Sequence, residues 1–155
     1  MSTSNAWLLE CSDALTVAVA DHEIVECVQP DQLFEVPTAP GYCRSVIPWQ
    51  GRLVPVLDMA SAFQAGTRQD SRYVCLLSYQ EAPHQPLRYI GVPVSRTPQK
   101  IEVDDEQVCE VSGEAVPALL QAISLCCFTH DELPVPIVDI ARLSSAEFRE
   151  MALAG

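Results

Sequence analysis

Residues 46–63 read V-I-P-W-Q-G-R-L-V-P-V-L-D-M-A-S-A-F, and residues 127–143 read C-F-T-H-D-E-L-P-V-P-I-V-D-I-A-R-L. Both stretches contain the pattern V-P-[VI]-[LV]-D-[MI]-A, which begins at Val54 in the first and 81 residues later, at Val135, in the second. In each copy two short apolar runs flank a turn, and the second run ends at an aspartate before a segment compatible with a helix. The repeat therefore predicts a two-lobed, pseudo-symmetric β protein with one copy in each lobe.

Short β-rich runs separated by turn residues continue this pattern over most of the chain. We expect strands at Ala14–Ala20, Ile24–Val28, Val46–Ile47, Leu53–Leu57, Tyr73–Tyr79, Leu87–Val94, Ile101–Val103, Leu125–Phe128 and Val135–Ile140. The stretch Val116–Ile123 fits either a strand or a helix, and Ser144–Ala154 predicts a C-terminal helix. Pro55 and Pro136 lie inside predicted strands and cannot donate a ladder hydrogen bond, so they predict edge strands or bulges. Such interrupted strands suit small barrels better than one broad sheet.

The composition is that of a folded domain. Of the 155 residues, 48% are hydrophobic and 19% are charged, which is enough apolar material for a core. We expect residues 1–155 to form a single domain made of two interleaved barrel subdomains. The first residues lack the features of a signal peptide, and no apolar run has the length of a membrane span. We therefore expect a cytoplasmic protein without membrane insertion.

Charge is distributed unevenly along the chain, which has a net charge of −12. Residues 1–43 contain seven acidic residues and no Lys or Arg, and residues 101–155 contain eleven acidic residues and two arginines. Residues 44–100 are the exception, with seven basic and three acidic residues. Such an acidic chain is a poor partner for nucleic acid, whereas the basic middle segment suits either a solvated face or contact with an acidic protein.

No catalytic or metal-binding motif is present in the sequence. The seven cysteines are odd in number and form no C-x-x-C pair, which favours reduced thiols that fill apolar space. Nucleophile-elbow, phosphate-loop, zinc-protease and dinucleotide motifs are all absent. We therefore expect a protein that is not an enzyme and has no metal and no cofactor.

The two repeated aspartates, Asp58 and Asp139, are predicted to be structural caps. Each ends a strand before a helix-compatible stretch, where an aspartate accepts hydrogen bonds from free backbone N–H groups. An alternative is a carboxylate dyad like that of an aspartic protease, but neither aspartate lies in a glycine-containing turn that would expose it. A hydrolase with a cysteine nucleophile and one of the three isolated histidines is a further alternative, although nothing selects the pair.

The stretch Val46–Phe63 resembles the signature of the CheW-like family, G-x-[IV]-N-x-R-G-x-[IV]-[IV]-P-[IV]-[IV]-D-L-x-x-x-F. The segments Val17–Glu26, Phe34–Pro40, Tyr89–Val94 and Val135–Leu143 resemble other parts of the family pattern in the same order. The resemblance thus extends over nearly the whole chain. It implies a mainly β fold of two small five-stranded barrels on a shared hydrophobic core, with short helices.

The resemblance also implies a role. CheW-like proteins are non-catalytic adaptors that join the regulatory domain of a CheA-like histidine kinase to the cytoplasmic tip of a chemoreceptor. A second hypothesis is that the chain is a CheW-like module for another regulatory or localisation partner.

The family carries over a set of partner-binding positions: Ile24, Glu26, Cys27, Ser45, Val46, Trp49, Gln50, Gly51 and Arg52. This sequence departs from the family at several of them. Gln50 stands where arginine is usual and cannot form the bidentate fork that arginine makes with a carboxylate. Pro48 and Ser45 replace a usual asparagine and glycine, and Ser95 replaces an aspartate. These departures point to a divergent or accessory adaptor, such as those in chemosensory systems that control type IV pili and twitching. We expect Ile24→Arg or Val46→Arg to abolish partner binding without unfolding.

Overall fold

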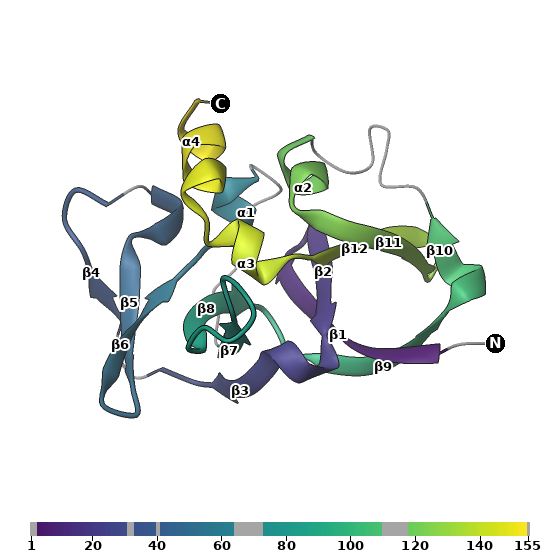
Figure 1. The fold of residues 1–155 in the computed structure, drawn as a ribbon, viewed down its shortest axis with the longest axis horizontal. Coiled ribbons are helices and arrows are strands. Elements are labelled where there is room, and N and C mark those ends of the chain that lie inside the picture. Colours follow the sequence, from purple (N-terminus) through teal and green to yellow (C-terminus); the bar gives the residue numbers. More distant parts are fainter. Residues whose placement is uncertain (1–2, 31–32, 40, 64–72, 110–117, 155) are drawn as a thin grey trace.

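The computed structural model describes residues 3–30, 33–39, 41–63, 73–109 and 118–154 (Figure 1). Its strands form two sheets of six strands each, which we call barrel A and barrel B. Barrel A contains β1 (Thr3–Ser12), β2 (Leu15–Ala20), β9 (Gln99–Asp104), β10 (Val108–Cys109), β11 (Ser124–His130) and β12 (Leu133–Val138). Barrel B contains β3 (Ile24–Val28), β4 (Phe34–Glu35), β5 (Ser45–Trp49), β6 (Arg52–Val56), β7 (Tyr73–Tyr79) and β8 (Arg88–Val94). Because β4 and β10 have only two residues each, five strands make up most of each barrel, as predicted.

The chain builds the two barrels in an interleaved order. It begins in barrel A with β1 and β2, completes barrel B with β3 to β8, and returns to barrel A with β9 to β12. Figure 1 shows this as purple and green strands side by side in one barrel and blue to teal strands in the other. The N-terminal hairpin is therefore part of the barrel whose other strands lie at the far end of the sequence.

The strand orders of the two barrels match each other. Barrel A has the order β10-β11-β12-β2-β1-β9, and barrel B read in the same sense has β4-β5-β6-β8-β7-β3. Each contains one parallel pair, formed through Ile137 and Ala18 in barrel A and through Val56 and Gly91 in barrel B. Because Val56 and Ile137 are 81 residues apart, the sequence repeat coincides with the structural one.

The hydrogen bonds around the repeat also correspond. The Asp58 N–H donates to the Tyr42 carbonyl, and the Asp139 N–H donates to the Ile123 carbonyl, at 2.7 and 2.8 Å. Both members of each bond differ by 81 residues between the copies. The prediction of a pseudo-symmetric pair of lobes is thus confirmed down to single backbone contacts.

The prediction that Pro55 and Pro136 mark edge strands or bulges is wrong. The strands β6 and β12 each lie between two neighbours, and the register shift in the β11–β12 pair falls between Ser124 and Cys126. The Leu57 N–H donates to Gly91 of β8, and alternate residues of a strand direct their amides to the same side, so the nitrogen of Pro55 also faces β8. The parallel pairing with β8 consists of a single bridge at Val56, so Pro55 lies where no ladder bond would form. By the same alternation the nitrogen of Pro136 faces β2, ahead of the single bridge between β12 and β2.

Three hydrophobic clusters form the core. The interior of barrel B contains Ile47, Val54, Val56, Val74 and Leu76. Counted through the strand registers, the corresponding residues of barrel A are Phe128, Val135, Ile137, Ala6 and Leu8, and all of them belong to or pack on the interior cluster of that barrel. The third and largest cluster lies between the barrels and contains residues of both. The two barrels therefore share one core, which agrees with the family expectation.

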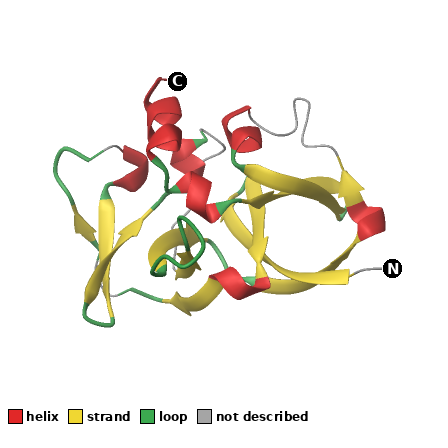
Figure 2. Ribbon diagram, in the orientation of Figure 1, coloured by secondary structure: helices red, strands yellow, loops and turns green. Residues whose placement is uncertain are grey.

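The four α-helices are short and lie near the junction between the barrels, whereas the turn η3 lies at the outer end of barrel A (Figure 2). They are α1 (Met59–Ala62), α2 (Ala118–Ala122), α3 (Ile140–Leu143) and α4 (Ala146–Ala154), with 3₁₀ turns η1 (Asp21–Glu23), η2 (Gly41–Cys43) and η3 (Asp105–Gln107). Met59, Ile140 and Phe148 bury their side chains completely in the cluster between the barrels. The C-terminal helix is thus confirmed, and it is part of the core rather than an appendage.

Three differences from the predicted elements stand out. The strand β1 was not predicted, because its first residues are polar and exposed and its apolar positions begin only at Ala6. The ambiguous stretch Val116–Ile123 contains the helix α2 at Ala118–Ala122, while Val116 and Pro117 lie outside the described residues. The predicted strand Val135–Ile140 ends at Val138, since Asp139 caps the following helix.

Candidate functional site

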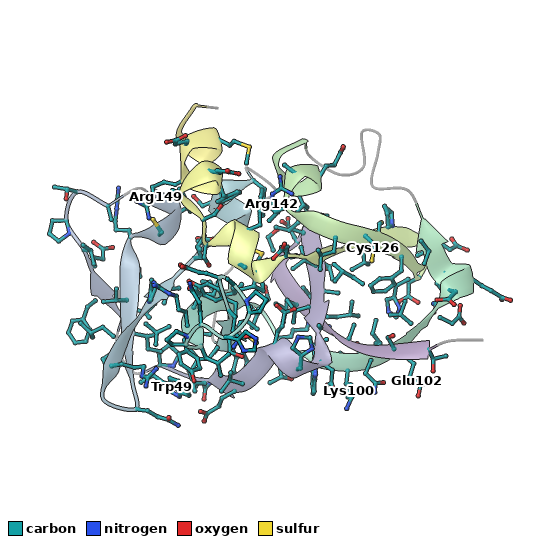
Figure 3. All side chains as sticks on the ribbon, viewed as in Figure 1. Trp49, Lys100, Glu102, Cys126, Arg142 and Arg149 are labelled. Carbon is teal, nitrogen blue, oxygen red and sulfur yellow. The ribbon has the colours of Figure 1, made fainter. Side chains whose placement is uncertain are left out.

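Four side chains meet at one end of barrel B, which we call the mouth of barrel B. The indole Nε1 of Trp49 donates to Oε2 of Glu26 at 3.0 Å. The rings of Trp49 and Tyr89 lie 5.2 Å apart between centroids and are tilted by 56°. The guanidinium carbon of Arg52 lies 4.9 Å from the centroid of the Tyr89 ring, within the range of a cation–π contact. Figure 3 shows Trp49 close to the tip of the β5–β6 hairpin, on the side where β3 runs.

The hairpin turn positions this cluster. Gln50 and Gly51 have φ values of 48° and 75°, and Trp49 pairs with Arg52 across the strands. A two-residue turn with both central φ values positive matches the right-handed twist of the strands and favours glycine. The positive φ of this turn position therefore explains the presence of glycine at Gly51. Gln50 is exposed at the tip of the turn.

The predicted binding residues do not form one surface. Glu26, Trp49 and Arg52 come together in the mouth of barrel B, next to the turn at Gln50 and Gly51. Val46 lies on the opposite face of β5 from Ile47 and Trp49, because side chains alternate along a strand.

Ser45, Ile24 and Cys27 lie elsewhere. Ser45 is at the far end of β5, where it pairs with Glu35 and Val56. Ile24 packs against the cluster between the barrels, and Cys27 pairs with the fully buried Cys75 of that cluster. Ser45 is therefore removed from the hairpin tip, whereas Ile24 and Cys27 belong to the same strand as Glu26 but contact the core between the barrels.

An apolar surface lies on the outside of barrel B, over strands β4, β5 and β6. We call it the outer face, and it comprises Phe34, Val46, Pro48, Leu53 and Pro55. Phe34 and Leu53 are 43% and 67% exposed, and both prolines are exposed as well. Scattered apolar residues on a surface are ordinary, but a contiguous set without a charged member indicates a contact site.

Part of the same region of barrel A is covered. Cys127 and Pro136, which correspond to Val46 and Pro55, are both buried. Barrel A is therefore closed at these two positions, whereas Thr129, which corresponds to Pro48, is exposed in barrel A as well.

The two repeated aspartates are helix caps, as predicted. The side chain of Asp58 accepts from the Ser61 N–H at 3.2 Å, and the side chain of Asp139 accepts from the Arg142 N–H at 3.3 Å. Each cap has extended backbone angles, with φ and ψ of −86° and 97° at Asp58 and −85° and 104° at Asp139. Their carboxylates thus stabilise the first turns of α1 and α3, which accounts for their presence without a catalytic dyad.

The described cysteines have the properties of core residues. Burial, followed by the charge of Asp58, raises the pKa of the Cys11 thiol to about 12. Burial also raises the pKa values of Cys27, Cys43 and Cys75. A nucleophilic cysteine needs a lowered pKa, so these four thiols are unsuited to that role. Among the residues that the structure describes, no group of three or more His, Cys, Asp or Glu side chains could hold a metal ion.

The fold and these surfaces define a two-barrel β protein with an exposed apolar face and a stacked aromatic cluster on barrel B. The family profile described as "CheW-like domain" matches residues 7–148. The chain belongs to the CheW-like family. No curated protein matches it at a significant level.

A solved structure supports the same fold. The chain is similar to the scaffolding protein TtCheW from Thermoanaerobacter tengcongensis, with a TM-score of 0.76 and 14% sequence identity. The similarity covers 96% of this chain and 92% of TtCheW. No helix in the described part of the chain is long and apolar enough to cross a membrane.

Sequence reasoning missed two parts of the site. Tyr89 was assigned only to a strand, although it stacks on Trp49 and lies under Arg52. Phe34 and Leu53 were not named as surface residues. The signal for Leu53 was present in the sequence, because it alternates with the interior residue Val54 on a strand that the repeat identifies, whereas Phe34 lies in a two-residue strand that was not predicted.

Proposed function

We propose that the protein is a non-catalytic adaptor that couples the regulatory domain of a CheA-like histidine kinase to a chemoreceptor tip or to a component of type IV pilus control. The observation that carries the proposal is the outer face of barrel B, which is apolar and exposed at Phe34, Leu53 and both prolines, whereas Cys127 and Pro136 of barrel A are buried. Membership of the CheW-like family supplies the class of partner. The proposal treats residues 1–155 as one cytoplasmic CheW-like domain.

The physical basis is anchor burial. A protein interface gains most of its affinity from a few well-packed apolar or aromatic residues and needs no titrating group. Phe34 and Leu53 are the most suitable anchors on the outer face, since both are large and exposed in the free chain. Their removal from water would contribute roughly 1.5 to 3 kcal/mol each if burial were complete.

The test is the affinity of the purified chain for the regulatory domains of the CheA-like kinases of the same cell, measured by calorimetry. We expect Leu53→Glu to weaken binding by roughly tenfold or more, because it places a charge among desolvated apolar groups. Leu125→Glu is the matched control, since Leu125 lies on barrel A and is 65% exposed, compared with 67% for Leu53. Equal loss in both variants, with unchanged circular dichroism, would remove the outer face from the proposal.

Receptor coupling is tested separately at the hairpin tip. Gln50 is exposed and replaces the arginine usual in the family, so Gln50→Arg restores a fork that can hold a carboxylate. We expect the variant to gain binding to a receptor tip in a pull-down while its kinase affinity stays unchanged. A variant that gains nothing would assign receptor binding to another surface.

The two variants predicted to abolish binding, Ile24→Arg and Val46→Arg, are expected to affect the protein differently. Ile24 is half-buried and packs on the core between the barrels, so Ile24→Arg is expected to destabilise the fold as well as any interface. Val46 lies on the outer face, and Val46→Arg remains a test of kinase binding. If no kinase domain binds the wild type at all, the second hypothesis applies, in which the same face binds a different regulatory or localisation partner.

A further inference from the structure

The end of barrel A that corresponds to the mouth of barrel B is hollow. A cavity of about 590 Å³ lies there, where the β1–β2 turn, the β8–β9 link and the β11–β12 turn meet. Leu8, Thr16, His130, Leu133 and Val135 are among its lining residues. We infer that this cavity, the mouth of barrel A, binds a ligand that carries an aromatic ring and a cationic nitrogen. The inference goes beyond the adaptor function and does not depend on it.

The opposite barrel shows what such a mouth accommodates. The strand registers make Trp49 correspond to His130, Tyr89 to Thr16 and Arg52 to Leu133. In barrel B these positions contribute an indole, a phenol ring and a guanidinium, which pack on one another. In barrel A the same positions carry His130, Thr16 and Leu133, so less aromatic volume is present and no cation stands at the position of Arg52.

The backbone keeps this cavity open at little cost. The strands β2 and β12 are bridged only at Ala18 and Ile137, so their first residues are not paired with each other. On β12 the backbone amides that would face β2 at this end belong to Pro134 and Pro136, which have no N–H to leave unsatisfied. The gap between the strands is therefore compatible with an apolar lining, to which both prolines contribute.

The charged residues that line the cavity favour a ligand with a positive charge. Three carboxylates line the cavity, at Glu10, Asp13 and Asp131, against the single guanidinium of Arg96. Arg96 lies 3.7 Å from Glu10, and His130 lies 3.5 Å from Asp131. The Arg96 side chain is 80% exposed, so its ion pair is weak and a ligand cation can replace it.

The experiment uses the full chain labelled with ¹⁵N, titrated with tryptamine and with indole-3-acetate. Both probes carry the same ring, and they differ in the sign of their charge. We expect tryptamine to shift the amide resonances of Thr16 and His130 and to bind at least roughly tenfold more tightly than indole-3-acetate. Equal affinity of the two probes, or no shift at these residues at millimolar tryptamine, would overturn the inference.

A third arm distinguishes a free amine from a partner side chain. The blocked tetrapeptide Trp-Gln-Gly-Arg copies residues 49–52, which fill the mouth of barrel B. Tighter binding of the peptide than of tryptamine would support a protein segment as the source of the aromatic ring and cation. The reverse order would support a small aromatic amine.

Variants then test the location. The double variant Thr16→Tyr with His130→Trp rebuilds the aromatic filling of barrel B, and it should abolish tryptamine binding. Thr129→Trp is the matched control, because it adds an indole to the opposite, exposed face of the same strand and should leave binding intact. If the double variant does not fold, Glu10→Gln provides the test with little change of shape, and several-fold weaker tryptamine binding is expected. Unchanged binding in Glu10→Gln and in a folded double variant would place the site elsewhere.

Discussion

Barrels A and B have the same strand order, the same single parallel bridge and the same capped helix after the repeated hairpin, yet their surfaces differ. Barrel B fills its own mouth with Trp49 and Tyr89 and exposes its outer face. Barrel A leaves its mouth hollow and buries Cys127 and Pro136 of the corresponding outer region. Where two equivalent positions have the same backbone arrangement but different side chains, the difference indicates a role that is specific to one barrel.

The largest effect is expected from removing one interior side chain of each barrel. Phe128 of barrel A corresponds to Ile47 of barrel B, and both are buried. Phe128→Ala should lower the free energy of unfolding by about 3 to 5 kcal/mol and Ile47→Ala by about 2 to 5 kcal/mol, because each leaves a cavity. Urea unfolding followed by the fluorescence of single-tryptophan variants, with Trp7 reporting on barrel A and Trp49 on barrel B, checks the result.

The shared core predicts that both probes change together in each variant. Separate transitions for Trp7 and Trp49 would show that the barrels unfold independently. In that case the hydrophobic cluster between the barrels would not couple their unfolding.

The next effect concerns the parallel bridge. A Cβ atom on Gly91 would lie 2.7 Å from Cγ1 of Val74, so Gly91→Ala should cost about 1 to 3 kcal/mol. Barrel A resolves the same position differently, since Ala18 corresponds to Gly91 and Ala6 to Val74. Adding Val74→Ala to Gly91→Ala should therefore cost less than the sum of the two single changes, which thermal unfolding of all three variants measures. Strict additivity would mean that the two barrels do not share this packing rule.

The caps should behave alike. Asp58→Ala and Asp139→Ala each remove one acceptor for a backbone N–H at the start of a four-residue helix. We expect each to cost about 1 kcal/mol in denaturant unfolding, whereas the corresponding Asn variants should lose little. A large loss in only one of the two would reveal a role for that aspartate beyond capping.

The smallest effect is a gain in stability. Glu132 has a φ of 67° at the turn position that Gly51 occupies in barrel B with a φ of 75°. Because a left-handed conformation is costly for a residue with a Cβ, Glu132→Gly should stabilise the protein by up to about 1 kcal/mol. Gly51→Ala is the opposite change and should destabilise it by a similar amount. Differential scanning calorimetry checks both, and a loss of stability in Glu132→Gly would contradict the equivalence of the two turns.

Much of this architecture could be predicted from the sequence. The repeat at Val54 and Val135 located both hairpins and both caps, because helix caps and strand alternation are local properties of the chain. The bounds of β3 and β7 agree with the prediction for the same reason. The prediction that failed depends on contacts between residues that are far apart in the sequence. The proline interpretation failed because it depends on which side of the strand carries a neighbour, and the parallel partners of β6 and β12 lie far away in the sequence.

The candidate site was less predictable than the fold. Trp49 and Glu26 are 23 residues apart and meet only because barrel B curves, and Tyr89 reaches them through the parallel pairing of β6 and β8. The cavity in barrel A has no sequence signal of its own, since it arises from side chains that are small in comparison with their counterparts. It becomes visible only when the two barrels are compared position by position.

The central claim is that barrel B, and not barrel A, presents the partner surface. The most direct measurement is methyl NMR of the chain with and without the regulatory domain of a CheA-like kinase that it binds. We expect the methyl resonances of Val46 and Leu53 to shift or broaden, while those of Leu125 on barrel A stay unchanged. Changes confined to Leu125 and its neighbours on barrel A would contradict the claim.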